Sequence, residues 1–209
     1  MKTLVKISIA LVVISFLLAG AIYPFLPAKI ASHWNYQGEV NGYMSRWTVF
    51  LMPTISLILI LLFMSLPKMD PLKDNYKYFS KYYDGLILVL TLFLIYINII
   101  TILFNFGYKF NFVYSILPAF SILFYYLGLL IENAKRNWFV GIRTPWTLYD
   151  EKIWMKTHHL GGKLFKLSAL LALVGLALPK QAFWFMIVPI MLSSIIVVVY
   201  SYFLFKKSR

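Results

Sequence analysis

The sequence predicts an all-α membrane protein, a bundle of six transmembrane helices. Of its 209 residues, 61% are hydrophobic and only 13% are charged, and the mean hydropathy is +0.78. Soluble domains carry roughly 45–50% apolar and about 25% charged residues, so a soluble fold of this length has too little interior for so much apolar surface. Because lipid offers the backbone no hydrogen bonds, we expect the spanning segments to be helical.

Six segments meet or approach the length of about 20 apolar residues that a spanning helix needs. The predicted spans are Leu4–Tyr23, Thr48–Leu66, Leu86–Phe106, Phe112–Ile131, Leu164–Leu178 and Ala182–Phe205. The fifth is the shortest, and it reaches across only if Lys163 and Lys166 extend to the interface. The first has the basic start of a signal peptide, but its apolar run is long, so we expect a retained helix.

The placement of lysine and arginine predicts that the N- and C-termini are both cytoplasmic. With this orientation, sixteen of the 20 basic residues, Lys2 among them, fall in inner segments. Four fall outside: Lys29, Arg46, Lys109 and Lys180. Such an excess is typical of cytoplasmic loops. The net charge of +13 is thus explained by topology, and no direct nucleic-acid partner is expected.

The spans divide the chain into three parts. Residues 1–66 form an N-terminal two-span unit with an outer loop at 24–47, residues 67–85 form a cytoplasmic connector, and residues 86–209 form a four-span unit with an inner signature at 135–165. In the connector, Asp70-Pro71 is typical of a helix start. The helix that follows is amphipathic, with lysines on one face and aromatic residues on another, and is expected to lie on the inner bilayer surface. The lysines are Lys73, Lys77 and Lys81, and the other face holds Leu72, Tyr76, Phe79 and Tyr83.

A polar stripe runs along the third predicted span, where Thr91, Asn98, Thr101 and Asn105 share one helix face. Such a stripe either joins helices by hydrogen bonds or forms the wall of a polar cavity, with Ser193 and Ser194 as partners in either case. The middle of every predicted span lacks acidic, basic and histidine residues, which counts against a proton-coupled pump.

Sequence patterns for catalysis and metal binding are missing. The chain has no cysteine and three histidines. His158 and His159 are adjacent and diverge on a helix, while His33 lies across the membrane in this topology. Zinc-protease, nucleophile-elbow and phosphate-loop patterns are absent. We therefore predict no metal, no cofactor and no enzyme. A lipid-modifying enzyme that uses Glu151 and His158 is the least favoured alternative.

The inner signature has local patterns of its own. Thr147 to Asp150 is similar to a capping box, so we expect a helix over Leu148–Leu160, stopped by Gly161-Gly162. On it Glu151, Trp154 and His158 share a face. This segment is either an interfacial helix with a belt of tryptophans or a ligand site. The belt residues are Trp138, Trp146 and Trp154.

Two motifs resemble the SdpI immunity-protein family of membrane proteins. "RNWFVGIRTPWTL", followed by "WMKTHHLGGKLF", resembles the family signature, and "LPAKIASHWNYQGEVNGYMSRW" is similar to the N-terminal domain of unknown function that often precedes it. The matching signature positions are Asn137, Gly141, Arg143, Thr144, Pro145, Glu151, Trp154, Thr157, His158, Gly161 and Gly162. The outer positions are Leu26, Pro27, His33, Trp34, Asn35, Gly38 and Gly42.

This resemblance implies a six-span protein of the cell membrane that protects a bacterium against a secreted, membrane-active peptide toxin of the sporulation-delaying type. It also implies a second role, in which a small cytoplasmic repressor is held at the membrane. We expect the peptide to contact the outer loop, where Asn41-Gly42 indicates a hairpin turn, and the polar stripe. Arg143, Glu151 and His158 would then form the inner contact surface. The alternative function is a transporter or exporter of lipids or small molecules that uses the polar stripe.

Overall fold

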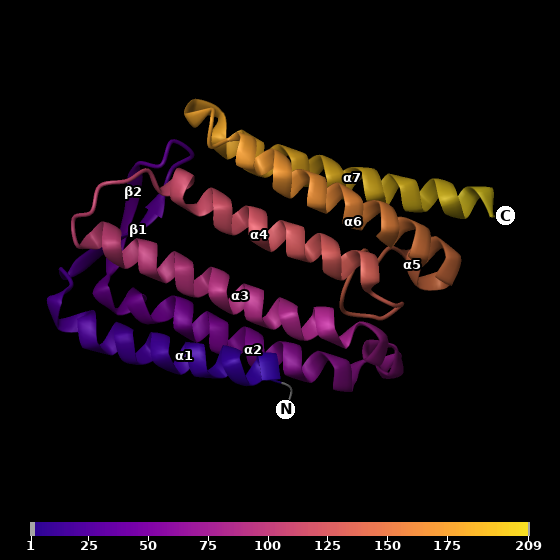
Figure 1. Ribbon diagram of the computed structural model, residues 1–209, viewed down its shortest axis with the longest axis horizontal. Coiled ribbons are helices and arrows are strands. Elements are labelled where there is room, and N and C mark those ends of the chain that lie inside the picture. Colours follow the sequence, from indigo (N-terminus) through magenta and orange to yellow (C-terminus); the bar gives the residue numbers. More distant parts are fainter. Residues whose placement is uncertain (1–2, 209) are drawn as a thin grey trace.

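The computed structural model describes residues 3–208 and shows a bundle of long helices with a β-hairpin at one end (Figure 1). Lys2 and Arg209, counted above among the inner charges, lie outside these described residues. The long helices are α1 (Thr3–Ile22), α2 (Leu51–Met69), α3 (Tyr76–Asn105), α4 (Phe112–Asn133), α6 (Glu151–Val174) and α7 (Ala182–Lys207). The short helix α5 (Pro145–Tyr149) precedes α6, and the hairpin pairs β1 (Lys29–Trp34) with β2 (Val40–Ser45). Single 3₁₀ turns occupy Tyr23–Phe25, Arg46–Phe50, Lys73–Asn75 and Pro179–Gln181.

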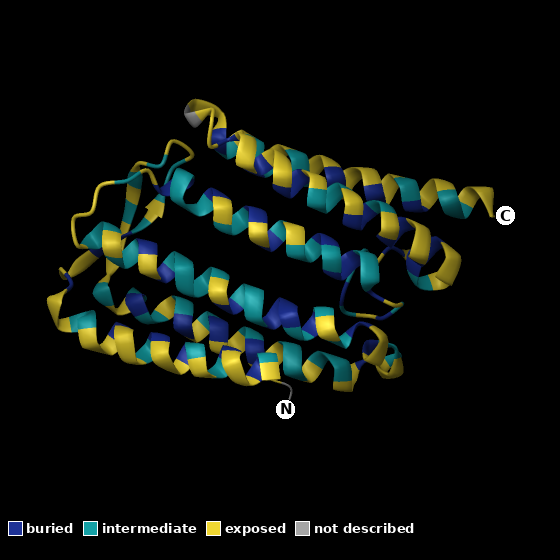
Figure 2. Ribbon diagram, viewed as in Figure 1, coloured by how far each residue is buried: buried dark blue, intermediate teal, exposed yellow. Residues whose placement is uncertain are grey.

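Five of the described helices, α1, α2, α3, α4 and α7, are long and apolar enough to cross a bilayer. Their outer faces are exposed (Figure 2), and many of the exposed residues are large and apolar. Leu17 is 69% exposed and Ile122 is 65% exposed, whereas the small polar side chains of Ser8 and Ser56 are almost wholly buried. Large apolar residues outside and small residues between helices are what a lipid solvent favours. The predicted helical membrane fold is therefore confirmed.

The helices form two groups that meet along one seam. Helices α1, α2 and α3 pack on one another, and α4 packs closely on α6, which in turn packs on α7. The principal helix contact between the groups is that of α3 with α4 (Figure 1). The hairpin caps one end of this seam, because its strand β1 contacts α3.

Helix α6 does not end at Gly161-Gly162, so the predicted helix end was wrong. The helix runs through both glycines to Val174 because Gly162 lies against α4. A Cβ atom at Gly162 would come within 2.7 Å of the Gly128 carbonyl, and one at Gly128 within 2.8 Å of the Gly162 carbonyl. The two backbones touch where side chains are absent, as small residues permit between membrane helices. The close packing of α4 on α6 therefore needs these glycines as helix residues.

The connector also differs from the prediction. Asp70 follows the last residue of α2 and does not begin a helix, and the aromatic side chains of Tyr76, Phe79 and Tyr83 are buried in the core. Helix α3 starts at Tyr76 and continues into the predicted third span, with a local departure from helical geometry at Phe79 (φ −127°, ψ 17°). The aromatic stripe fits the interior because α1 and α2 pack against this part of α3.

Candidate functional site

The outer loop folds as a hairpin whose turn is made by Asn35. Its side-chain Oδ1 accepts hydrogen bonds from the backbone N–H groups of Gln37 and Glu39, each at 2.9 Å, an arrangement that asparagine favours in turns. Gly38 completes the turn at φ +84°. The predicted turn at Asn41-Gly42 was wrong, because both residues lie within β2.

His33 faces Asn41 and Gly42 across the strand pair. Its Nδ1 lies 2.5 Å from Asn41 Oδ1. A Cβ atom at Gly42 would lie 2.9 Å from the His33 Cβ, so Gly42 leaves room for the histidine. The hairpin thus uses Asn35, Gly38 and Gly42 for its shape and presents His33 and Trp34 as larger side chains.

Two asparagines attach the hairpin to the helices. Asn105, the last residue of α3, accepts a hydrogen bond from the Ala31 N–H at 2.7 Å and donates one to the Ala31 carbonyl at 3.1 Å. Asn111, which caps α4, donates to the Gln37 carbonyl at 2.7 Å. Because both polar groups of Ala31 are satisfied by one amide side chain, the position of β1 above α3 is fixed.

Trp34 lies under the hairpin against two aromatic rings. Its indole stacks on Phe112 at a centroid distance of 3.8 Å and an interplanar angle of 8°, and it meets Phe104 edge-on at 5.5 Å. The indole Nε1–H is buried and has no hydrogen-bond acceptor among the described residues. An unpaired buried donor costs about 1–3 kcal/mol, so this group is the unsatisfied polar feature of the outer site.

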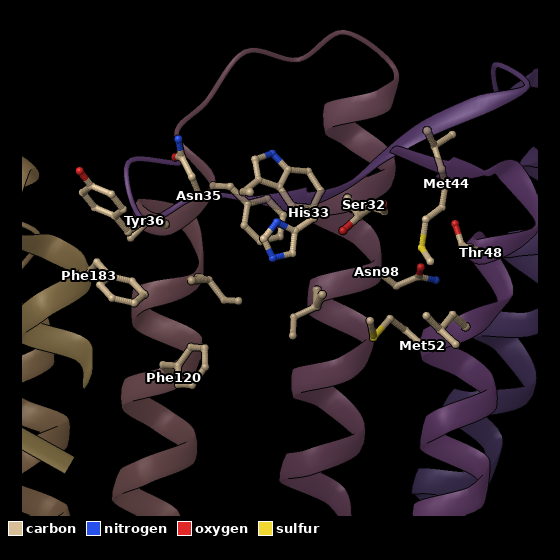
Figure 3. A pocket seen from close by; sticks show the side chains of 18 of the residues that line it. Ser32, His33, Asn35, Tyr36, Met44, Thr48, Met52, Asn98, Phe120 and Phe183 are labelled. Atoms are coloured by element: carbon tan, nitrogen blue, oxygen red, sulfur yellow. The ribbon is translucent and has the colours of Figure 1, made fainter. Parts of the chain in front are cut away.

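A cavity of about 600 Å³ lies beneath the hairpin. Figure 3 shows Asn98 and Met52 on one side, Phe120 and Phe183 on the other, and His33 above them. Its walls are mostly apolar and come from α2, α3, α4 and α7. The polar side chains that line it include Ser32, His33, Asn35, Thr48, Asn98 and Thr101. The structure thus brings the predicted outer-loop residues together with the middle of the predicted polar stripe.

The polar stripe itself divides into three roles. Asn98 and Thr101 line the cavity, and Asn105 holds the hairpin. Thr91 is buried deeper in the bundle, where its hydroxyl donates to the Ile87 carbonyl of its own helix. The two serines of α7 are not its partners: the Ser193 hydroxyl lies 2.8 Å from that of Ser168 on α6, and exposed Ser194 bonds its own helix.

At the other end of the molecule, Asn137 organises the start of the inner signature. Its fully buried side chain accepts hydrogen bonds from the Phe139 and Val140 N–H groups and donates to the Lys135 and Val140 carbonyls. The Tyr76 hydroxyl also lies 3.3 Å from Asn137 Oδ1. This segment has no helical or strand partner, so the asparagine satisfies its backbone.

Asp70 completes the same network from the α2–α3 connection. Its carboxylate accepts hydrogen bonds from the Trp138 N–H at 2.9 Å, the Leu72 N–H at 2.7 Å and the Tyr76 hydroxyl at 3.1 Å. Only 2% of Asp70 is exposed. Sequence reasoning missed Asp70 and Asn111 as structural anchors. The available signal was a polar residue directly beside an apolar span.

Helix α5 begins at a cap formed by Thr144 and Thr147. The Thr144 hydroxyl accepts from the Thr147 N–H, the Thr147 hydroxyl accepts from the Thr144 N–H, and Pro145 occupies the first turn. The predicted box over Thr147 to Asp150 was therefore misplaced by three residues. Asp150 instead caps α6 by accepting from the Lys152 and Ile153 N–H groups.

Trp154 and His158 are structural residues inside the signature, not an exposed ligand face. Their rings stack at 3.8 Å, and each residue is 1% exposed. Trp154 Nε1 donates to the Ala134 carbonyl at 2.8 Å, so Trp154 cannot be a belt anchor. His158 Nε2 accepts from the Ile142 N–H at 3.0 Å, and Nδ1 lies 2.9 Å from the Trp154 carbonyl. Both contacts fit a neutral ring with its proton on Nδ1.

The surroundings of His158 explain two more signature positions. Gly141 has φ +113° and touches the imidazole, so any side chain there would strain the backbone and meet the ring. Thr157 is fully buried, and its hydroxyl has no partner among the described residues. Burial lowers the pKa of His158 to about 4 from its usual 6.5. The ring is therefore neutral at physiological pH.

Some polar groups of the signature remain accessible at this end of the molecule. Arg143 is exposed and donates to the Trp138 carbonyl at 2.6 Å, and Glu151 is exposed on the first turn of α6. Lys166 and His159 flank Glu132 between α4 and α6. Within residues 3–208, no cluster of three or more His, Cys, Asp or Glu side chains could hold a metal ion.

The fold and site define a class: a multi-pass membrane protein with an extramembrane hairpin over a cavity and a hydrogen-bonded signature at the opposite end. Residues 133–201 match the SdpI/YfhL protein family, and residues 10–57 match a domain of unknown function, DUF1648. The chain is thus similar to the SdpI/YfhL family over these residues, and the protein resides in the cell membrane. Immunity protein SdpI of Bacillus subtilis (strain 168) is 28% identical over 202 residues, which cover 96% of this chain and 95% of that protein. No solved structure matches the chain.

The buried neutral His158 predicts loss of stability in mild acid. Its pKa is 6.5 in the unfolded chain and about 4 in the fold, so the unfolded state binds more protons between these values. Stability should therefore fall as the pH falls from 6.5 to 4, by about 3 kcal/mol from this group. Thermal unfolding in detergent at several pH values measures the effect.

The matched control is the neighbouring, solvent-exposed histidine. His158→Gln keeps an acceptor for the Ile142 N–H but cannot titrate, so it should flatten the decline of unfolding temperature between pH 6.5 and 4. His159→Gln should leave the decline unchanged. The same slope in wild type and His158→Gln would contradict a buried neutral imidazole.

Proposed function

We propose that this protein is an integral membrane immunity protein that gives its cell resistance to a secreted, membrane-active peptide toxin. The relative that carries the name immunity protein aligns over nearly all of both chains, which supports this role. The structural observation behind it is the outer cavity of about 600 Å³, which Trp34 lines together with His33, Asn98 and Thr101.

A peptide fits the chemistry of this cavity. It supplies backbone carbonyls as hydrogen-bond acceptors, together with apolar side chains that lose contact with water or lipid headgroups on entry. We propose that His33, Trp34, Asn98 and Thr101 contact the peptide. Asn35, Gly38 and Gly42 act indirectly, by holding the hairpin in its shape.

We also propose that α6 is a sixth span and that both termini are cytoplasmic. Its 24 residues correspond to about 36 Å of helix, and it packs alongside α4 and α7. Its first half is charged, which fits an inner end that projects from the bilayer. The excess of basic residues on the inner side supports the orientation. The hairpin would then face the medium from which a secreted peptide arrives.

A second candidate role is the recruitment of a small cytoplasmic repressor by the inner signature. The observation that favours it is that α3 runs from the inner signature to the outer hairpin and contacts both. Its last residue, Asn105, bonds the hairpin, and its first, Tyr76, bonds Asp70 and Asn137. We propose that Arg143 and Glu151, which stay exposed, would contact such a partner.

The immunity proposal predicts a specific effect of Trp34→Phe. Phenylalanine keeps an aromatic ring against Phe112 but offers less apolar surface to the peptide, so peptide affinity should fall about tenfold, equivalent to about 1.4 kcal/mol. The measurement is survival of a toxin-sensitive host that expresses each variant, over a range of concentrations of a secreted membrane-active peptide toxin. Trp184→Phe, an exposed tryptophan of α7, should protect like wild type.

Membrane levels of the variants must be equal before survival is compared. Two outcomes would overturn the proposal: full protection by Trp34→Phe and Asn98→Leu together, or killing that wild-type protein does not reduce for any toxin of the class. Energy-dependent efflux that is lost in Asn98→Leu would instead favour the transporter alternative.

The orientation is tested with alkaline phosphatase, which folds only where disulfides form, outside the cytoplasm. In a bacterium with a periplasm, a fusion after Trp138 should be inactive and one within the hairpin turn, after Gln37, should be active. Activity of the Trp138 fusion at a comparable level would reject the cytoplasmic placement of the inner signature and of the N-terminus.

A further inference from the structure

A second cavity lies at the end of the bundle opposite the hairpin. It has a volume of about 500 Å³ and lies between the last turns of α2 and the first turns of α3. Figure 1 shows that α2 and α3 extend past the first turns of α1, so α1 flanks only part of this groove. Its apolar walls include Val5, Phe63, Met64, Tyr76, Tyr83 and Ile87.

A proline shapes this groove. Pro67 lies inside α2 and has no N–H to donate to the Phe63 carbonyl one turn earlier. The Tyr83 hydroxyl donates to that carbonyl at 2.7 Å instead. Tyr76 is held in the same way by Asp70 and Asn137. The two tyrosine rings are therefore held in the wall of the groove, and their hydroxyl groups already donate hydrogen bonds within the protein.

The rim of the groove carries positive charge. Lys68 from α2 and Lys77 from α3 both line it, both are exposed, and neither has a carboxylate partner among the described residues. The Lys77 ammonium group lies 5.1 Å from the centroid of the Tyr78 ring. The half-buried Ser80, about one turn beyond Lys77 on α3, also lines the groove, and its hydroxyl makes no hydrogen bond within the described chain.

One acidic residue also lines the groove. Asp84 lies two turns beyond Lys77 on α3, about 10 Å along the helix. It already interacts with other parts of the protein. The rim of the groove therefore carries two ammonium groups without carboxylate partners among the described residues. The deeper wall consists mostly of apolar side chains.

We propose that this groove binds one anionic phospholipid of the cytoplasmic leaflet. The phosphate lies between the Lys68 and Lys77 ammonium groups and accepts a hydrogen bond from Ser80, while an acyl chain lies along Phe63, Met64 and Ile87. Basic residues at the inner surface attract anionic lipid, and the apolar wall adds the selectivity of a shaped site. The proposal rests on the cytoplasmic placement of this end and is independent of the toxin.

The experiment uses the full chain in detergent with dioleoylphosphatidylglycerol or dioleoylphosphatidylcholine. Native mass spectrometry counts the lipids retained per protein, and thermal unfolding reports stabilisation. Wild type should retain one phosphatidylglycerol and be stabilised by it, with weaker retention of phosphatidylcholine. The double variant Lys68→Gln, Lys77→Gln should retain phosphatidylglycerol at least tenfold more weakly.

The matched control is Lys73→Gln, Lys81→Gln, which removes two exposed lysines from the same segment that do not line the groove. It should bind like wild type, and Lys68→Arg, Lys77→Arg should restore binding. Unfolding temperatures without lipid show whether each variant is folded. Equal loss in both glutamine pairs would mean that only general surface charge acts, and equal retention of the two lipids by wild type would also overturn the proposal.

Discussion

The outer cavity depends on one amide side chain. Asn105 meets both backbone polar groups of Ala31, as a neighbouring strand would, and it does so from the last residue of α3. This contact satisfies the edge of a two-stranded sheet close to the bilayer, where unpaired groups are costly. It also fixes how far the hairpin lies from the end of α3. Trp34, three residues further along β1, then stacks on Phe112 and closes the cavity from above.

The inner end uses the same physical solution. Asn137 replaces the missing secondary-structure partners of residues 135–140, and Asp70 joins that segment to the connection between α2 and α3. Side-chain amides and one carboxylate thus hold irregular backbone at both ends of the bundle. Between these ends, α3 contacts α4 along the seam. A bundle fixed at its ends can keep a cavity at the hairpin end of that seam while the helices stay in place.

Composition and charge were sufficient to predict the helical membrane fold, because both reflect a chain that is surrounded by lipid along its spans and by water at their ends. Long apolar runs predicted α1, α2, α4 and α7 to within a few residues. The errors came from packing. Gly161-Gly162 has the local pattern of a helix end, yet contact with α4 makes it part of α6. Likewise, the stripe of Tyr76, Phe79 and Tyr83 has the pattern of an interfacial helix, yet α1 and α2 cover it.

The candidate site was also predictable in part from local sequence patterns. Helical spacing placed Asn98, Thr101 and Asn105 on one face, and the family motif indicated His33 and Trp34. The structure brings these residues together under the hairpin. Sequence spacing could not distinguish buried His158 from exposed His159, because burial depends on Gly141 and Ile142 from a different segment. The residue types in this part of α6 predicted a polar, accessible helix face, but packing buries Trp154 and His158.

We propose that a peptide toxin occupies the cavity beneath the hairpin. Hydrogen–deuterium exchange of the full-length protein, with and without a membrane-active peptide toxin against which it protects cells, tests this claim directly. Occupation should slow exchange of the β1 amides from Ala31 to Trp34, because the bound peptide restrains the hairpin from below. Unchanged exchange in β1, at peptide concentrations that slow exchange elsewhere in the protein, would contradict the claim.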